Sequence, residues 1–262
     1  MLSLKLISAG LLDEYIENFD KELFDRFAAL KESVLTTKTY SFYTSVSAVF
    51  SSKIEGEEVE LDSYVKHKKL KVKFNPDYTQ KIDDLYSAYI FAQSHPLNEK
   101  TLCEAYELLS KNLLHSSRQG AYRTGNMFVM TPDGKIEYVA PSPYKLKYEL
   151  TDFFEDLDVL LNNEISFAET FFFASFLHLV FVKIHPFEDG NGRTARLLEK
   201  WFLAEKLGKQ AWYLQSEKFY YDFHQEYYST LRTLGLEYET LNYEKALPFL
   251  KLLPELLKRI EI

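Results

Sequence analysis

The feature that most constrains this chain is a long apolar run followed at once by a short stretch of glycine and charged residues. Residues 167–184 are mostly apolar and long enough for a helix, and Ser166 and Glu169 are spaced as a capping box at its start. Residues 194–207 predict a second amphipathic helix. Between them, residues 185–196 read His-Pro-Phe-Glu-Asp-Gly-Asn-Gly-Arg-Thr-Ala-Arg. The chain is therefore predicted to form a helix-loop-helix.

The loop has the chemistry of a magnesium nucleotide site. Glycines at 190 and 192 allow backbone amides to converge at the start of the second helix, which favours an anion such as phosphate. Arg193 and Arg196 lie three residues apart, share a helical face and suit a polyphosphate. Asp189 would repel phosphate unless a cation bridged the two, as Mg²⁺ does.

His185 is the candidate general base, because an imidazole is largely neutral at neutral pH and can take a proton. Glu188 and Asp189 would raise its pKa, whereas the arginines and a metal would lower it. The sequence leaves the direction of the shift open.

The 185–196 run resembles the signature of the Fic family, HPFx(D/E)GNGRxxR, and meets every fixed position. The resemblance implies a mainly α fold, a single Fic-type helical bundle, and transfer of AMP from ATP to a hydroxyl of a target protein. It implies that His185 deprotonates the target's Ser, Thr or Tyr, that Asp189 holds Mg²⁺, and that Phe187 anchors the loop. The phosphates would be bound by Gly190, Asn191, Gly192, Arg193 and Arg196.

An upstream segment, residues 51–56, resembles the inhibitory pattern (S/T)xxxE(G/N) of the same family. It implies that Glu55 pairs with Arg196 and prevents ATP from placing its γ phosphate. Ser51 would cap or brace that helix end, and Gly56 would end the helix. An exposed pair would have little effect, so this interpretation requires Glu55 to be shielded.

Two short β-prone runs around a Pro-Asp-Gly turn predict a hairpin within residues 120–141. The resemblance implies a flap here, whose edge pairs with an extended target segment. Its target-contacting residues would be Met127, Phe128, Val129 and Tyr138. Tyr122 and Arg123 would support the flap. Further along, Tyr227 would help to form the nucleoside pocket, although core packing is an equal alternative.

Other helical patterns cover residues 11–31, 77–94, 98–113, 144–161 and 243–260, and Gly208 is placed to end the helix that precedes it. The expected organisation is an N-terminal helical region, 1–75, which carries the inhibitory motif, and a Fic catalytic core, 76–262. His178 is expected to be a hydrogen-bonded structural histidine, since it belongs to an apolar helix.

The composition restricts the partners. Its 262 residues carry a net charge of −8, which argues against general nucleic-acid binding. One cysteine, Cys103, excludes an internal disulfide, and no signal peptide is evident. The 167–184 run carries Glu169, His178 and Lys183, so it predicts a buried core helix rather than a membrane span. We expect a cytoplasmic protein, and a homo-oligomer stays open.

Two alternative functions share the motif. One is removal of AMP, or transfer of another phosphate-bearing group, at the same loop. The other is a nucleotide-dependent interaction module without catalysis, in which the flap and the lysine-rich stretch 66–73 bind a partner. An intact His185 argues against the second.

Overall fold

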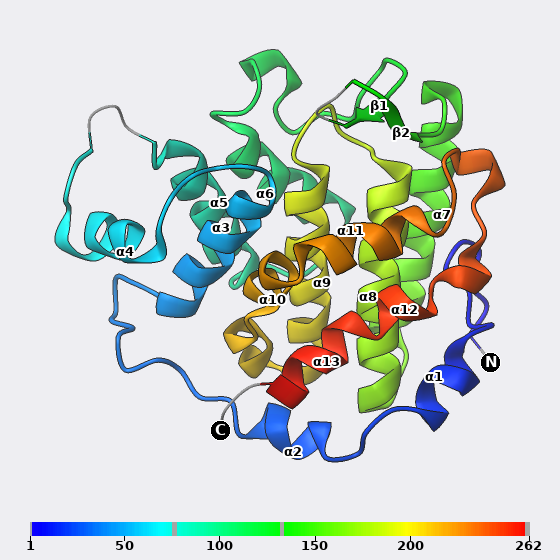
Figure 1. Ribbon diagram of the computed structural model, residues 1–262, viewed down its shortest axis with the longest axis horizontal. Coiled ribbons are helices and arrows are strands. Elements are labelled where there is room, and N and C mark those ends of the chain that lie inside the picture. The colour runs from blue at the N-terminus through cyan, green and yellow to red at the C-terminus, as the bar shows by residue number, and fades with distance from the viewer. Residues whose placement is uncertain (1, 75–77, 132–133, 260–262) are drawn as a thin grey trace.

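The protein is described by a computed structural model over residues 2–74, 78–131 and 134–259. It is mainly α with one two-stranded antiparallel sheet, which confirms the predicted fold class (Figure 1). The larger elements are α1 (Leu12–Glu17), α2 (Leu23–Ala28), α3 (Phe42–Ile54), α4 (Leu61–Leu70), α5 (Gln80–Ala92), α6 (Glu99–Ser110), β1 (Phe128–Met130), β2 (Ile136–Val139), α7 (Pro143–Asn162), α8 (Phe167–Ile184), α9 (Asn191–Leu207), α10 (Ser216–Asp222), α11 (His224–Arg232), α12 (Leu247–Leu250) and α13 (Leu252–Arg259).

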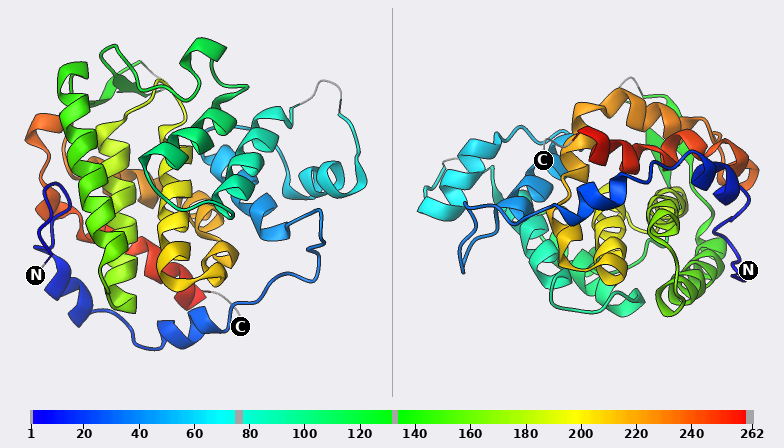
Figure 2. Two further views of the ribbon diagram at one scale, coloured as in Figure 1. Left: turned by 180° about the vertical axis from the view of Figure 1, so that it is seen from behind. Right: turned by 90° about the horizontal axis from the view of Figure 1, so that it is seen from below.

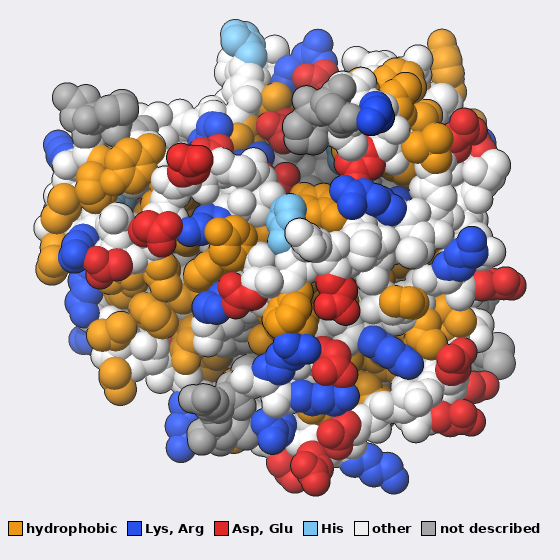
Figure 3. All heavy atoms as spheres, in the orientation of Figure 1, with side chains coloured by type: hydrophobic (Ala, Val, Ile, Leu, Met, Phe, Trp, Pro, Cys, Tyr) orange, Lys and Arg blue, Asp and Glu red, His pale blue; other side chains and the backbone are white. Residues whose placement is uncertain are grey.

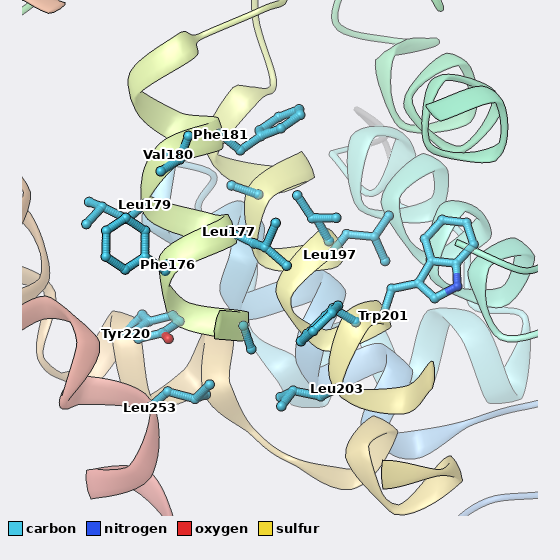
Figure 4. Packing of buried hydrophobic residues seen from close by; sticks show 14 of the residues in the cluster. Phe176, Leu177, Leu179, Val180, Phe181, Leu197, Trp201, Leu203, Tyr220 and Leu253 are labelled. Carbon is cyan, nitrogen blue, oxygen red and sulfur yellow. The ribbon is translucent and has the colours of Figure 1, made fainter. Parts of the chain in front are cut away.

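Helices α8 and α9 form the centre, and the other helices pack around them (Figures 1 and 2). Leu177 of α8 points toward Leu197 of α9, whereas Trp201 lies on the other side of α9, away from α8 (Figure 4). The predicted capping box is present, since Ser166 accepts from the backbone of Glu169 and the Glu169 side chain bonds back. Among the described residues, α8 alone is long and apolar enough to cross a membrane, but 78% of it is buried inside the protein. It is a core helix.

The N-terminal helices share this core. Helix α1 packs on α8, α2 packs on α13, and α3 packs on α5 and α10. Helix α4 projects from one side of the molecule, seen at the left of Figure 1. The predicted boundary between N-terminal region and core, at residues 75–76, lies outside the described residues. The packing places α3 directly against the centre of the fold.

Two predicted helices are wrong in extent. Residues 11–31 form α1 and α2 instead of one helix, because the Asn18 side chain bonds to Glu14 O and the Asp20 side chain accepts from Glu22 N, which end one helix and begin the next. In place of the helix predicted over 243–260, residues 243–259 are divided into a short 3₁₀ turn, α12 and α13, and residue 260 lies outside the described residues. Pro254 has no N–H to donate to Leu250, so a continuous helix is not possible there.

The helix after the loop begins earlier than predicted. Helix α9 starts at Asn191 instead of residue 194, because Gly190 adopts a left-handed conformation with φ +81° and lets the chain turn directly into the helix. Gly208 ends it, as predicted. The first helical turn is thus made by the glycine-rich loop residues themselves.

The predicted hairpin is present, with Phe128 opposite Val139 and Val129 opposite Tyr138. Residues 132–133 of its predicted turn lie outside the described residues. Strand β2 is also held on its other side, where Val139 N donates to Leu236 O. The surface is hollowed next to this hairpin (Figure 3), and this is where the ends of α8, α9 and α11 meet.

Candidate active site

The loop between α8 and α9 is closed by Asn191. Its Oδ1 accepts from Phe187 N and its Nδ2 donates to Phe187 O, both at 2.9 Å. The Asn191 side chain is buried and fully engaged by the loop. Only its backbone is therefore available to a ligand, which refines the predicted role of this residue.

Phe187 fixes the loop to the core, as predicted. Its side chain is fully buried and stacks on the ring of Tyr106 with a centroid distance of 3.4 Å. Tyr122 stacks near it at 5.4 Å, and the Tyr106 hydroxyl donates to Asp189 O at 3.0 Å. Helix α6 thus packs against the loop through Tyr106.

Arg123 joins the loop to the hairpin. Its guanidinium donates to His185 O at 2.7 Å, to Gly125 O at 2.9 Å and to Pro141 O at 2.7 Å. Its backbone N–H donates to Pro186 O at 2.9 Å. The buried Arg123 therefore connects the 185–196 loop with the end of the predicted flap, which agrees with its predicted support role.

His185 ends α8 in a left-handed conformation with φ +51°, so its ring leaves the helix axis and lines the cavity beside the loop. Its Nδ1 lies 3.1 Å from Val182 O. A carbonyl can only accept, so Nδ1 carries the proton and Nε2 keeps a free lone pair. Burial lowers the pKa of His185 to about 4, which outweighs the opposing hydrogen bond. The imidazole is therefore neutral at neutral pH and can act as a base.

Arg193 is a buried cation with unused donors. Its side chain is 6% exposed, and its Nη2 lies 3.4 Å from Asp189 Oδ1. Its Nε and Nη1 are buried without a hydrogen-bond partner within the described part of the chain. Such donors cost free energy unless a ligand satisfies them. Because the N–H groups of the first turn of α9 have no partner within the helix either, this end of α9 is suited to an anion.

Arg196 is held by the end of α3. Its Nη2 lies 2.6 Å from Glu55 Oε1 and 3.1 Å from Ser51 O, and its Nε donates to Ser51 Oγ at 2.9 Å. Arg196 is fully buried, whereas 25% of the Glu55 side chain is exposed. Burial alone would raise the pKa of Glu55, but Arg196 and Arg193 outweigh it and lower that pKa. Glu55 is an ionised, mostly shielded partner of Arg196.

Of the two predicted roles of Ser51, capping or bracing the end of α3, its contacts fit bracing. It lies inside the helix and bonds to Arg196 through both its hydroxyl and its carbonyl. Gly56 has φ +91° and follows the last helical residues, as predicted for the end of the helix. The carboxylate of Glu55 reaches over the loop, since a Cβ on Gly192 would meet Glu55 Oε1 at 2.5 Å.

A cavity of about 140 Å³ opens next to these groups. Its lining includes His185, Gly192, Arg196 and Glu55, together with side chains of the hairpin and α11. Tyr227 is 2% exposed and lines it, and its hydroxyl lies 3.4 Å from Arg196 Nη1 and 2.9 Å from His178 Nε2. His178 is fully buried and bonds to Glu199 at 2.8 Å, so it is structural as predicted.

Part of the chain matches a known protein family. Residues 96–203 match the family model described as the Fic/DOC family. This segment is a Fic domain. It spans α6 to most of α9 and includes the hairpin, Arg123 and the whole 185–196 loop.

One relative is a "Protein adenylyltransferase Fic" from Nematostella vectensis, which is 38% identical over 84 residues. That match covers 32% of this chain and only 18% of the relative. A solved Fic family protein from Desulfovibrio desulfuricans is similar in structure, with a TM-score of 0.72 and 23% identity. The match covers 98% of this chain and 73% of that protein's chain. A solved Fic domain containing signaling protein from Bacteroides thetaiotaomicron has a TM-score of 0.64 and 18% identity. This match covers 95% of this chain and 91% of that protein's chain. The similarity in fold thus extends beyond the Fic domain into the N-terminal helices.

In this Fic domain the predicted flap residues differ in exposure. Phe128 is 48% exposed, Met127 is half-buried, and Val129 lines the cavity. Tyr138 is only 5% exposed, and its hydroxyl donates to Lys183 O at 2.5 Å. The prediction that Tyr138 contacts a target is therefore wrong: alternation along β2 turns its ring inward, where it fixes the flap to α8.

Several site residues were not predicted. Lys183, Glu137 and Arg232 line the cavity of the Fic domain, and Glu137 forms an ion pair with Arg232. Lys183 could have been noticed as a charge in an apolar helix two residues before His185. Nothing in the sequence pairs Glu137 with Arg232, because they lie on β2 and α11.

Proposed function

We propose that this protein is a protein adenylyltransferase, which transfers AMP from ATP to a hydroxyl side chain of a target protein. The observation that carries the proposal is the juxtaposition of a neutral His185 with a free Nε2 and a buried Arg193 with unused donors, at the ends of α8 and α9. A base beside an anion site is what attack of a hydroxyl on a phosphate requires.

The proposed step balances as follows. The target hydroxyl oxygen forms a bond to the α phosphorus, and the bond from that phosphorus to the oxygen bridging to the β phosphate breaks. Pyrophosphate leaves, and the hydroxyl proton passes to Nε2 of His185. Proton removal by such a base is worth about a hundred-fold to ten-thousand-fold in rate. The N–H groups of the first turn of α9, with Arg193 and Arg196, would stabilise the charge on the phosphates.

Asp189 fits the role of a magnesium ligand. Its side chain is 51% exposed at the mouth of the loop, and Oδ1 accepts from Gly190 N at 2.5 Å, which leaves Oδ2 open. No cluster of three His, Cys, Asp or Glu side chains suited to a metal occurs in the described part of the chain. A cation at Asp189 would thus depend on substrate oxygens for its other ligands, as Mg²⁺ does with nucleotides. Bound there, Mg²⁺ would neutralise phosphate charge.

Glu55 would restrain this reaction. It occupies Arg196 and the space above Gly192, both of which the phosphates of ATP need. The fully buried guanidinium and the mostly shielded carboxylate supply the shielding that an effective inhibitory pair requires. The resting protein is therefore proposed to be autoinhibited.

The target would be an extended protein segment added to β1. In the described residues, β1 pairs only with β2, so its outer edge presents free backbone groups. Phe128 and Met130 on this strand are 48% and 51% exposed and could enter pockets between target side chains. Strand addition of this kind uses main-chain hydrogen bonds for affinity.

The test is incubation of the Glu55→Gly variant with Mg²⁺ and ATP labelled at the α or at the γ phosphate, with cell lysate as the source of targets. Relative to lysate alone, we expect additional protein-bound label from α-labelled ATP, no additional label from γ-labelled ATP, and no additional label with Glu55→Gly combined with His185→Ala. Label from γ-labelled ATP alone would indicate phosphoryl transfer instead. Label that persists without His185 would refute the proposal.

A further inference from the structure

Lys183 is a buried lysine whose ammonium has no hydrogen bond or ion pair in the described residues. It lies on α8, is 4% exposed, and lines the cavity of the active site. Its contact is the face of the Tyr138 ring, 4.3 Å from Nζ. By contrast, the fully buried Lys200 is satisfied by Ser47 Oγ, Leu214 O and the carboxylate of Glu217. The core of this protein can therefore satisfy a buried lysine, and at 183 it does not.

The Lys183 ammonium borders the cavity instead of a protein acceptor, and the burial of the rest of the side chain disfavours its charged form. Burial lowers the pKa of Lys183 to about 8, against the opposing influence of Glu137. Residues whose charge is disfavoured in this way, and which also line a cleft, are candidates for contact with a ligand. A ligand atom with a free lone pair would remove the penalty.

Lys183 shares the cavity with a carboxylate of the hairpin. The Glu137 carboxylate, on β2, acts on Lys183. Both side chains line the cavity together with Val129, Tyr228 and Leu231. Apolar and aromatic walls with a few polar groups are suited to a nucleobase.

We infer that Lys183 and Glu137 read the base of the bound nucleotide. The Lys183 ammonium donates to a ring nitrogen, and the Glu137 carboxylate, which Arg232 holds, accepts from the neighbouring exocyclic amino group. One donor beside one acceptor matches adenine, which presents N7 as an acceptor next to the N6 amino donor, whereas guanine presents two acceptors, N7 and O6, on the same edge. This inference rests on the proposed function, because it assumes a nucleotide in the cavity.

The test is direct binding of magnesium ATP and magnesium ITP to the Glu55→Gly protein by calorimetry, without any target. Inosine replaces the amino group of adenine by a carbonyl, so it removes the donor that Glu137 would accept. In this background we compare Lys183→Met, Lys183→Gln and Glu137→Gln. Lys251→Met is the control, since Lys251 is a half-buried lysine that lines a different pocket and has no ionic partner in the described chain.

We expect Lys183→Met to weaken ATP binding by about tenfold to a hundredfold, the worth of one hydrogen bond to a charged group, and Lys183→Gln to weaken it less. The melting temperature of ligand-free Lys183→Met should not fall, because an unpaired charge is removed. Glu137→Gln should narrow the preference for ATP over ITP. The control should bind as its parent does.

Unchanged ATP affinity in Lys183→Met overturns the inference and leaves the proposed function intact. A loss of affinity accompanied by a lower ligand-free melting temperature than the control would assign Lys183 a structural role in holding Tyr138, which also overturns it. If the parent Glu55→Gly protein binds no nucleotide, the proposed function itself fails.

Discussion

Replacement of Glu55 by glycine is expected to raise the rate of AMP transfer, because Glu55 is the charged competitor for Arg196. The Arg196 side chain also contacts Ser51 and Tyr227, but those partners are neutral. The Glu55 contact is the shortest, at 2.6 Å. Removing it frees Nη2 for a phosphate and opens the space above Gly192.

The magnitude follows from the geometry. One hydrogen bond between charged groups is worth roughly 1.5 to 3 kcal/mol. Glu55 binds through a single oxygen and 25% of its side chain is exposed, so the lower part of this range applies. About 1.5 to 2 kcal/mol corresponds to a rate increase of roughly ten-fold to thirty-fold.

The assay is incorporation of label from α-labelled ATP per unit time, with Glu55→Gln as the matched control. Glutamine keeps the volume above Gly192 and loses only the charge, so its rate should lie between those of the parent and of Glu55→Gly. Without ATP, Glu55→Gly should melt at a lower temperature, since a fully buried Arg196 is left without its anion. ATP should restore more of that stability in Glu55→Gly than in the parent. Equal rates for all three proteins would refute the restraint.

Four further outcomes follow from the same geometry. His185→Ala should lower transfer by about a hundred-fold to ten-thousand-fold while ATP still binds, measured by label incorporation beside calorimetry. Because the pKa of His185 is lowered to about 4, the base form persists well below pH 6.5, so activity should stay level down to about pH 5; a half-loss near pH 6.5 would contradict this. The same shift affects stability, because His185 takes up its proton near pH 6.5 in the unfolded chain and only near pH 4 in the folded one. The free energy of unfolding should therefore fall as the pH drops between those values. His185→Gln should lessen that fall in denaturant titrations. Arg123→Met should lower the free energy of unfolding by about 2 to 4 kcal/mol, since several buried carbonyls lose their donor. Arg118→Met, which removes a surface ion pair with Glu188, should lower it by less than about 1 kcal/mol. Equal losses in the two variants would refute the bracing role of Arg123.

The sequence predicted best the elements whose signals are local. Helix α8 was predicted to the residue because a capping box begins it and the loop at His185 ends it. The divided segments at 11–31 and 243–260 failed where apolar periodicity continues through a local break. Pro254 was visible in the sequence, but the prediction followed the helical pattern around it. In the structure Pro254 cannot donate to the Leu250 carbonyl, and the helix is divided there.

The site was predictable where one short motif holds all of its parts, and less so where distant segments meet. The contact of Glu55 with Arg196 came from the family resemblance and is present at 2.6 Å, but the two bonds from Ser51 to the same arginine depend on how α3 packs against α9. Tyr138 was misassigned because only the hairpin register decides which β2 side chains face inward. The sequence shows a lysine at 183, but only the packed structure shows that its ammonium has no hydrogen-bond acceptor among the described residues.

The most direct test of the central claim is intact-mass spectrometry of a purified acceptor protein after incubation with Mg²⁺, ATP and the Glu55→Gly variant. The account predicts a gain equal to one adenylyl group on the acceptor, less of it with the parent protein, and none when His185→Ala is added. A gain equal to a single phosphoryl group, or an adenylyl gain that does not depend on His185, would contradict it.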